Sequence, residues 1–323
     1  MIPSQHPDSQ LLLLDESLHQ QLANLQEKFA AEGQNLSCYL EKLLYDKGVD
    51  YSDYLSIETL LTLQKPRTGF PDELVFILFH QISELYFRMI LWELEQLTVP
   101  VEMLGEELFL DKINRLNRYY RQLIRSFDIM SDGLDVAQFQ KFRTALFPGS
   151  GFQSLQYRVI EICSTDAFNL MPRKIRENIP EHLPLREIFE KLYWKKGALH
   201  VGSGRKSVTL TNFEMKYNAL LLQKLKDYKH RNLWQMFRRF YEKSGNSEFI
   251  VQALRTFDQL ANVGWPFAHY KVVLKALAND RPGGLESTGG TNWSKYLHPS
   301  SHAIIFFPQL WSVEERADWG LAH

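Results

Sequence analysis

The chain has 323 residues, enough for one large or two ordinary domains with a sizeable hydrophobic core. Its 37 Lys and Arg residues balance 38 Asp and Glu residues, which argues against a nucleic-acid or membrane-surface partner. The two cysteines, Cys38 and Cys163, lie too far apart for metal-ligand spacing and fit a reducing compartment. The first residues lack the basic start of a secretory signal, and no apolar run approaches the length of a membrane span. We therefore expect a soluble, cytoplasmic protein.

The N-terminal part of the chain has the periodicity of short amphipathic helices. Two helices are predicted over residues 11–31 and 36–47, separated by a Gly- and Asn-containing break. A third helix, capped by Ser52 or Ser56, follows and ends at Lys65–Pro66, because the residue before a proline disfavours the helical conformation.

The stretch from Pro71 to Leu97 predicts a long central helix. Apolar residues recur there at three- and four-residue spacing and also fill other faces, so we expect the helix to be buried on most sides. His80 stands four residues after Phe76 and four before Glu84, which places all three on one stripe. Such a histidine is typical of a metal pair, of a tautomer-fixing pair or of a hydrogen-bonded core residue, and spacing alone leaves the three open.

The rest of the chain also predicts helices, and no segment shows the alternation of a β-strand or an internal repeat. The expected helices cover residues 106–130, 134–146, a segment carrying Tyr157–Glu161, much of 172–245, 246–262 and 264–279. The Gly/Pro/Ser/Thr-rich segment 280–295 predicts a long loop of the kind that closes a site or lacks order. The sequence therefore predicts an all-α fold, with residues 1–323 forming a single domain and 1–60 its N-terminal segment.

Arg143 is a charged residue in aromatic surroundings, with Phe139, Phe142 and Phe147 as its sequence neighbours. An arginine cannot lose its charge on burial, so it needs an anion from the protein or from a ligand. Arg143 is therefore a candidate anion-binding residue.

His269 follows Gly264-Trp265-Pro266, which has the pattern of a helix start with proline in the first turn. A position near the positive end of a helix favours the neutral imidazole that binds metals. Two histidines on separate helices, without a carboxylate cluster, suit haem, which needs one axial histidine, better than a bare metal ion that needs three protein ligands. A core histidine without a ligand remains the alternative.

Five segments, in order along the chain, resemble the motifs of the tryptophan 2,3-dioxygenases. They are Tyr51–Leu55 (YSDYL), Asp72–Leu94 (DELVFILFHQISELYFRMILWEL), Ser150–Arg158 (SGFQSLQYR), Trp265–His269 (WPFAH) and Thr288–Gly290 (TGG). The five motifs span residues 51 to 290, whereas residues 172–262 align only loosely.

The resemblance implies an all-helical, cytoplasmic homotetramer that uses haem b and acts in tryptophan catabolism. That family inserts both atoms of O₂ across the indole C2–C3 bond of L-tryptophan and gives N-formylkynurenine. Two alternatives remain: a related haem-dependent mono-oxygenase or hydroxylase of a tryptophan- or tyrosine-like amino acid, and a haem-binding sensor without enzymatic activity.

The same resemblance assigns roles to particular residues. His269 resembles the proximal iron ligand, and His80 resembles the distal histidine that contacts the indole N–H. The residues expected to bind the substrate are Phe76, Phe139, Arg143, Ser150 and Thr288, together with Tyr51 and Tyr54 from a neighbouring subunit. The further residues expected on the cofactor side are Trp265, Gly289 and Gly290.

Several residues depart from the pattern of the family. Pro266 stands where the family usually has arginine, and the stretch from His269 to Thr288 is longer than usual. Ser287 precedes Thr288 where glycine is common, and Thr291–Trp293 replaces a serine-rich continuation. These positions bear on substrate and rate more than on haem binding. No cysteine follows His269 closely, which argues against a covalently tethered haem.

Overall fold

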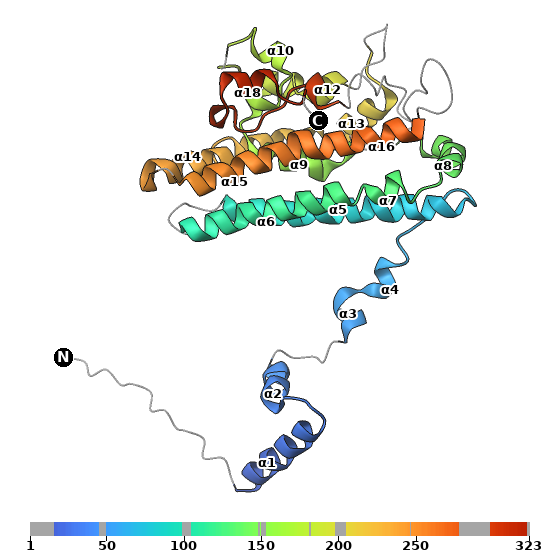
Figure 1. Ribbon diagram of the computed structural model, residues 1–323, viewed down its shortest axis with the longest axis vertical. Helices are drawn as coiled ribbons and strands as arrows, with labels where there is room; N and C mark the ends of the chain where they lie inside the picture. Colours follow the sequence, from blue (N-terminus) through green and yellow to red (C-terminus); the bar gives the residue numbers. More distant parts are fainter. Residues whose placement is uncertain are drawn as a thin grey trace, which may run out of the picture. The chain divides into compact units, whose positions relative to one another are not determined.

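The computed structural model describes residues 16–44, 50–98, 105–147, 149, 153–180, 182–197, 205–245, 247–277 and 298–321. Within these ranges the chain forms helices and no β-strand, which confirms the predicted all-α class (Figure 1). Its contacts divide the chain into two compact units, Met1–Leu63 and Gln64–His323. The interpretation of residues 1–323 as a single domain stays a prediction.

The N-terminal unit consists of short helices. They are α1 (Glu16–Ala31), α2 (Leu36–Leu44), α3 (Tyr51–Leu55) and α4 (Ile57–Leu60). Asp50 caps α3 by accepting a hydrogen bond from the Asp53 amide at 2.8 Å. No described residue of this unit is buried, although many of its side chains are apolar. The described part of the unit therefore has no hydrophobic core of its own.

The second unit contains the long helices. They are α5 (Pro71–Leu97), α6 (Glu106–Arg125), α9 (Leu155–Ser164), α13 (Val208–Tyr228), α14 (Leu233–Ser244), α15 (Glu248–Gln259) and α16 (Trp265–Leu277). The shorter α-helices are α7 (Asp128–Ser131), α8 (Val136–Phe142), α10 (Arg173–Arg176), α11 (Leu185–Glu190), α12 (Tyr193–Gly197) and α18 (Val313–Ala317). The 3₁₀ helices are η2 (Arg143–Leu146), η4 (Ala167–Leu170), η6 (Pro299–Ser301) and η7 (Pro308–Leu310), and η5 (Leu260–Gly264) is a π-helix.

The predicted helices exist, but several boundaries differ from those expected. The segment 106–130 is divided between α6 and α7, and 134–146 between α8 and η2. Within the segment 172–245, the last part forms two helices, α13 and α14, because Asn232 caps a new helix by accepting from the Gln235 amide at 3.0 Å.

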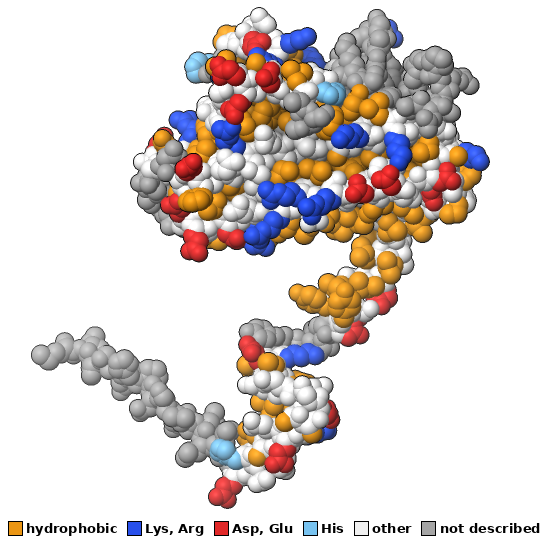
Figure 2. All heavy atoms as spheres, viewed as in Figure 1, with side chains coloured by type: hydrophobic (Ala, Val, Ile, Leu, Met, Phe, Trp, Pro, Cys, Tyr) orange, Lys and Arg blue, Asp and Glu red, His pale blue; other side chains and the backbone are white. Residues whose placement is uncertain are grey.

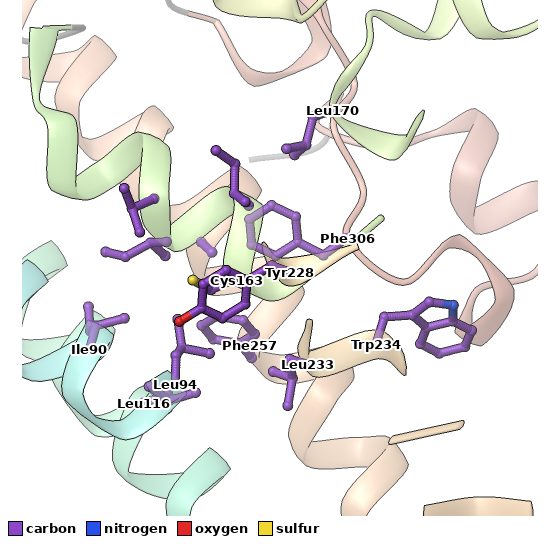
Figure 3. Packing of buried hydrophobic residues seen from close by; sticks show 14 of the residues in the cluster. Ile90, Leu94, Leu116, Cys163, Leu170, Tyr228, Leu233, Trp234, Phe257 and Phe306 are labelled. Carbon is purple, nitrogen blue, oxygen red and sulfur yellow. The ribbon is translucent and has the colours of Figure 1, made fainter. Parts of the chain in front are cut away.

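The long helices of the second unit pack in layers (Figure 1). Helix α6 packs against both α5 and α15, and α5 also packs against α9, while α15, η5 and α16 follow one another as a single rod. The core between these layers is apolar. Figure 3 shows Ile90 and Leu94 of α5, Leu116 of α6, Cys163 of α9 and Phe257 of α15 packed together in it.

Charged side chains join α5 to α6 across this core. The buried carboxylate of Glu93 on α5 accepts from Lys112 at 2.8 Å and forms an ion pair with Arg115 at 3.0 Å. Near the start of α5, the buried Glu73 carboxylate accepts from the amides of Arg67 at 2.7 Å and Thr68 at 2.8 Å. Both carboxylates therefore have the partners that a buried charge requires.

The expectation that α5 is buried on most sides is wrong. Leu85 and Trp92 are 53% and 55% exposed, and Ile82 and Met89 are exposed on the same face. Apolar side chains accordingly line the lower edge of the second unit, over α5, in Figure 2. The face that packs inside the unit carries Phe79, Phe87, Ile90, Leu91, Leu94 and Leu97 instead. A sequence pattern shows that a face is apolar but does not show what covers it.

By length and composition alone, α5 could also cross a membrane, contrary to the expectation from the sequence. The core helix of a soluble protein meets the same criterion, and a single such helix is a weak indication. The contacts of Glu93 with Lys112 and Arg115 of α6 tie α5 into the helical unit.

The two cysteines differ in their surroundings. Cys38 on α2 is exposed, whereas Cys163 on α9 is fully buried. Burial raises the pKa of the Cys163 thiol to about 12. Cys163 is therefore a core residue with an unreactive thiol.

Candidate functional site

His80 lies on α5, one helical turn after Phe76. Its Nδ1 lies 2.7 Å from the Phe76 carbonyl oxygen, and because a carbonyl only accepts, Nδ1 carries the proton. Burial lowers the pKa of His80, against the opposing effects of the Phe76 carbonyl and the Glu84 charge. The ring is therefore neutral near pH 7, and its Nε2 is an acceptor.

His269 lies on α16 and is also neutral. Burial, with a smaller contribution from His80, lowers the pKa of His269 to about 4. The influence of His80 means that the two imidazoles lie near each other, since charge interactions weaken with distance. No hydrogen bond to the His269 ring comes from any residue that the structure describes.

The expectation that His269 lies near the start of a helix is wrong. Helix α15 passes through the π-helix η5 directly into α16 without a break in the helical backbone. Pro266 therefore lies inside a continuous helix, and the neutral state of His269 results from burial rather than from the helix dipole.

A chain of aromatic contacts joins the two histidines. The His80 ring lies 4.1 Å from Phe76 and 5.5 Å from Phe79. Phe79 packs at 5.5 Å against Phe127, which stacks on His269 at 5.9 Å. Phe79 and Phe127 were not predicted as site residues, because their aromatic character was the only signal in the sequence. The surroundings of both imidazoles are thus apolar and aromatic.

Trp265 lies one turn before His269 on the same rod. Its ring stacks on His269 with centroids 5.9 Å apart, and it packs against Tyr157 of α9 at 4.7 Å. It thus lies beside His269, where a residue on the cofactor side is expected.

Phe139 and Arg143 reach the same region from α8 and η2. The Asp72 carboxylate on α5 accepts from the Asp135 amide at 2.7 Å and so ties the start of α8 to the start of α5. Phe139 then packs against Phe76 at 5.9 Å. Arg143 is only 8% exposed, and burial lowers the pKa of its guanidinium. The structure thus brings a desolvated cation close to the aromatic residues around His80.

The remaining predicted site residues are not part of this cluster as described. Tyr51 and Tyr54 lie on α3 of the N-terminal unit, where they are 77% and 79% exposed. Ser150, Thr288, Gly289 and Gly290 lie outside the described residues. Their predicted roles therefore stay predictions.

The site rings remain partly accessible although protein surrounds them. Phe76, Phe139, Trp265 and His269 are only half-buried, and His80 is exposed, yet burial lowers the pKa of both imidazoles. Among the described residues, no group of three or more His, Cys, Asp or Glu residues could hold a metal ion. The fold and site define an all-helical protein that offers two neutral imidazoles, from two helices, within aromatic surroundings.

Comparison with known proteins agrees with this class. A family model described as tryptophan 2,3-dioxygenase matches residues 40–178. The tryptophan 2,3-dioxygenase of Bacillus thuringiensis (strain Al Hakam) is 28% identical over 297 residues, which cover 85% of this chain and 98% of the relative. That of Burkholderia pseudomallei (strain 668) is 25% identical over 281 residues, which cover 84% and 86%. The chain is thus similar to tryptophan 2,3-dioxygenases over most of its length and, at 25–28% identity, divergent from them.

Proposed function

We propose that the chain is a haem-dependent dioxygenase that opens the indole C2–C3 bond of L-tryptophan and forms N-formylkynurenine. The observation that carries this proposal is the pair of neutral imidazoles, His80 on α5 and His269 on α16, joined by aromatic side chains. The names of the relatives support the choice of tryptophan as the substrate.

The residues of the site have the chemistry that a haem requires. Haem is a flat apolar ring that needs one axial imidazole, and His269 offers a neutral ring without a hydrogen bond to any described residue. Trp265 and Phe127 stack on that imidazole and limit its rotation. Gly289 and Gly290 complete the cofactor side in this proposal. When bound, the haem iron supplies the binding and activation of O₂, which protein side chains cannot supply.

His80 is proposed to orient the indole. Its Nδ1–H is used by the Phe76 carbonyl, so Nε2 remains free to accept a hydrogen bond from the indole N–H. A protonated His80 would have no acceptor, and burial opposes that form. His80 therefore serves as a neutral hydrogen-bond acceptor and not as an iron ligand.

Arg143 is proposed to bind the carboxylate of the amino acid. Its guanidinium lies in surroundings that lower its pKa, where a bidentate carboxylate is a favourable partner. Phe76 and Phe139 would pack against the flat indole, and Ser150 and Thr288 would contact the polar end of the substrate. This set of side chains binds one aromatic amino acid in a fixed orientation.

Self-association is the second part of the proposal, in a soluble cytoplasmic protein without nucleic-acid or membrane partners. Ile82, Leu85, Met89 and Trp92 form an exposed apolar stripe on α5 with the alternating spacing of a helix–helix seam. A second copy of the chain can present the same stripe and cover it. In the resulting assembly, a homotetramer by resemblance to the family, Tyr51 and Tyr54 would contact the substrate of a neighbouring subunit.

Product mass tests the proposed reaction. Reduced, haem-loaded protein is mixed with L-tryptophan without oxygen, O₂ is then added, and the product is analysed by mass spectrometry. We expect two added oxygen atoms. One added atom would instead identify a mono-oxygenase, and unchanged tryptophan would identify a haem-binding protein such as a sensor.

A further inference from the structure

The π-helix before His269 has a hydrogen-bonding problem that Pro266 creates. In η5 the Trp265 amide donates to the Leu260 carbonyl, five residues back. The next carbonyl in this register belongs to Ala261, and residue 266 would supply its donor. Proline has no amide hydrogen, so Pro266 cannot make that bond. Ala261 is fully buried, where an unpaired carbonyl would be costly.

Tyr157 of α9 supplies a donor to this carbonyl. Its hydroxyl lies 3.4 Å from the Ala261 carbonyl oxygen. Tyr157 is buried, and burial raises the pKa of its hydroxyl well above the ordinary value of 10.0, so the hydroxyl keeps its proton. The same ring packs against Trp265 at 4.7 Å, and Trp265 stacks on His269 at 5.9 Å.

We propose that Tyr157 is a positioning residue, whose hydroxyl replaces the hydrogen bond lost at Pro266 and fixes the π-helix that aims His269. A π-helix inserts one extra residue into a helical rod, so every later side chain is rotated relative to α15. His269 follows η5 by little more than one turn, and its direction therefore depends on that insertion being fixed. Tyr157 acts on His269 through the backbone of Ala261 and the ring of Trp265.

Amide hydrogen exchange of the full-length, haem-free protein tests this role directly. In Tyr157→Phe the ring remains and only the hydroxyl is lost. We expect the amides of residues 263–270 to exchange roughly five- to tenfold faster, the effect of losing one buried hydrogen bond.

Tyr120→Phe provides the matched control. Tyr120 on α6 is also fully buried, but its hydroxyl has no hydrogen-bond partner among the described residues. This variant should leave exchange in residues 263–270 unchanged. Equal effects of the two substitutions would overturn the proposal, because they would show that any lost buried hydroxyl loosens this helix.

The missing amide hydrogen at position 266 can be restored by a separate substitution. Pro266→Ala restores an amide that can pair with the Ala261 carbonyl, so Tyr157→Phe should have no further effect on exchange in that background. An undiminished effect of Tyr157→Phe in the Pro266→Ala protein would also overturn the proposal.

The consequence for His269 is measured in the haem-loaded protein and rests on the proposed function. We expect Tyr157→Phe to shift or broaden the iron–imidazole stretching band of the ferrous protein in resonance Raman spectra, and Tyr120→Phe to leave it unchanged. If the wild-type protein shows this iron–imidazole band and Tyr157→Phe leaves it unaltered, the proposal that Tyr157 orients His269 is overturned. A histidine-type spectrum that survives in His269→Ala would instead overturn the ligand assignment, without touching the exchange result.

Discussion

The imidazole rings of His80 and His269 differ in their hydrogen-bond partners. His80 uses Nδ1 for the Phe76 carbonyl at 2.7 Å, which fixes its ring on α5. The His269 ring is held only by stacking against Trp265 and Phe127 among the described side chains. The two histidines should therefore respond differently to removal.

His269→Ala should lose stable haem incorporation, whereas His80→Ala should keep haem and lose turnover by ten- to roughly a few-hundredfold, as expected for one polar contact to the substrate. The ratio of haem to protein and the Soret band measure the first effect, and initial rates measure the second. His230→Ala is the control, because His230 is exposed beyond the end of α13. Loss of haem from His80→Ala alone would reverse the two assignments.

Arg143→Leu should raise the KM for tryptophan sharply and leave tryptamine, which lacks the carboxylate, nearly unaffected. Removing one partner of a buried charge pair typically costs about 2–5 kcal/mol. Lys141→Leu is the control, because it removes a nearby exposed cation. An equal rise in the KM for tryptophan and for tryptamine would mean that Arg143 stabilises the fold rather than binding the carboxylate.

His302 should make stability depend on pH. It lies 5.1 Å from the Tyr193 ring, beside the buried ion pair of Arg158 and Glu161 at 2.8 Å, and burial with the Arg158 charge lowers its pKa from 6.5 to about 4. The unfolded chain therefore takes up a proton first as the pH falls. This contribution to stability is complete above pH 6.5 and is lost towards pH 4, at up to about 1.4 kcal/mol per pH unit.

Urea unfolding of wild type and His302→Gln between pH 4 and 6.5 measures this contribution. The free energy of unfolding should fall less steeply with decreasing pH in the variant. Burial raises the pKa of Asp258 to about 6, which gives the opposite trend in both proteins and cancels in the difference. Parallel curves for the two proteins would contradict the prediction.

Among the elements, α5 carries different sets of side chains on two faces. Phe79 packs inside the helical unit and contacts the His80 ring, whereas Leu85 and Trp92 lie on the exposed stripe. The periodicity of the sequence indicates that one face of α5 is apolar and that the other mixes apolar and polar residues. It cannot distinguish a face that the same chain covers from one that is exposed in the single chain, because both carry apolar residues at helical spacing.

Leu85→Glu should convert the assembly to smaller species, because it places a charge on the apolar stripe that a second copy is proposed to cover. Light scattering with size-exclusion chromatography gives the mass. Met215→Glu on α13 is the control, since Met215 is an 80% exposed apolar residue away from the stripe. An unchanged mass of the Leu85→Glu protein would exclude this face as the interface.

The α15–η5–α16 rod shows where sequence interpretation reaches its limit. His269 was identifiable as an imidazole within an apolar helix, and Trp265 through its spacing from His269. Pro266 is typical of a first helical turn, but here the π-helix and the Tyr157 hydroxyl allow it inside a continuous helix. That hydroxyl comes from α9, more than a hundred residues away in sequence, so no local pattern could have revealed it. The Asp258 carboxylate, which accepts from the Phe306 and Phe307 amides, was missed for the same reason.

For the whole molecule, the in-trans role of Tyr51 and Tyr54 can be tested by mixing. A chain without residues 1–63 keeps Arg143 but lacks both tyrosines, and the Arg143→Leu chain has the reverse defect. Each alone should be nearly inactive, whereas a mixture that exchanges subunits should recover part of the activity, because one pocket in a mixed pair is complete. No recovery in samples with proven exchange would mean that each chain completes its own site.

The different surroundings of the two cysteines make the unaltered protein suitable for distance measurement. A maleimide spin label should react with the exposed thiol of Cys38 and spare the buried thiol of Cys163, whose pKa is raised to about 12. Each subunit would then carry one probe, on α2 of the N-terminal unit, without any substitution. Pulsed dipolar spectroscopy between these probes would report how far apart the N-terminal units lie in the assembly, and whether adding tryptophan draws them to new distances.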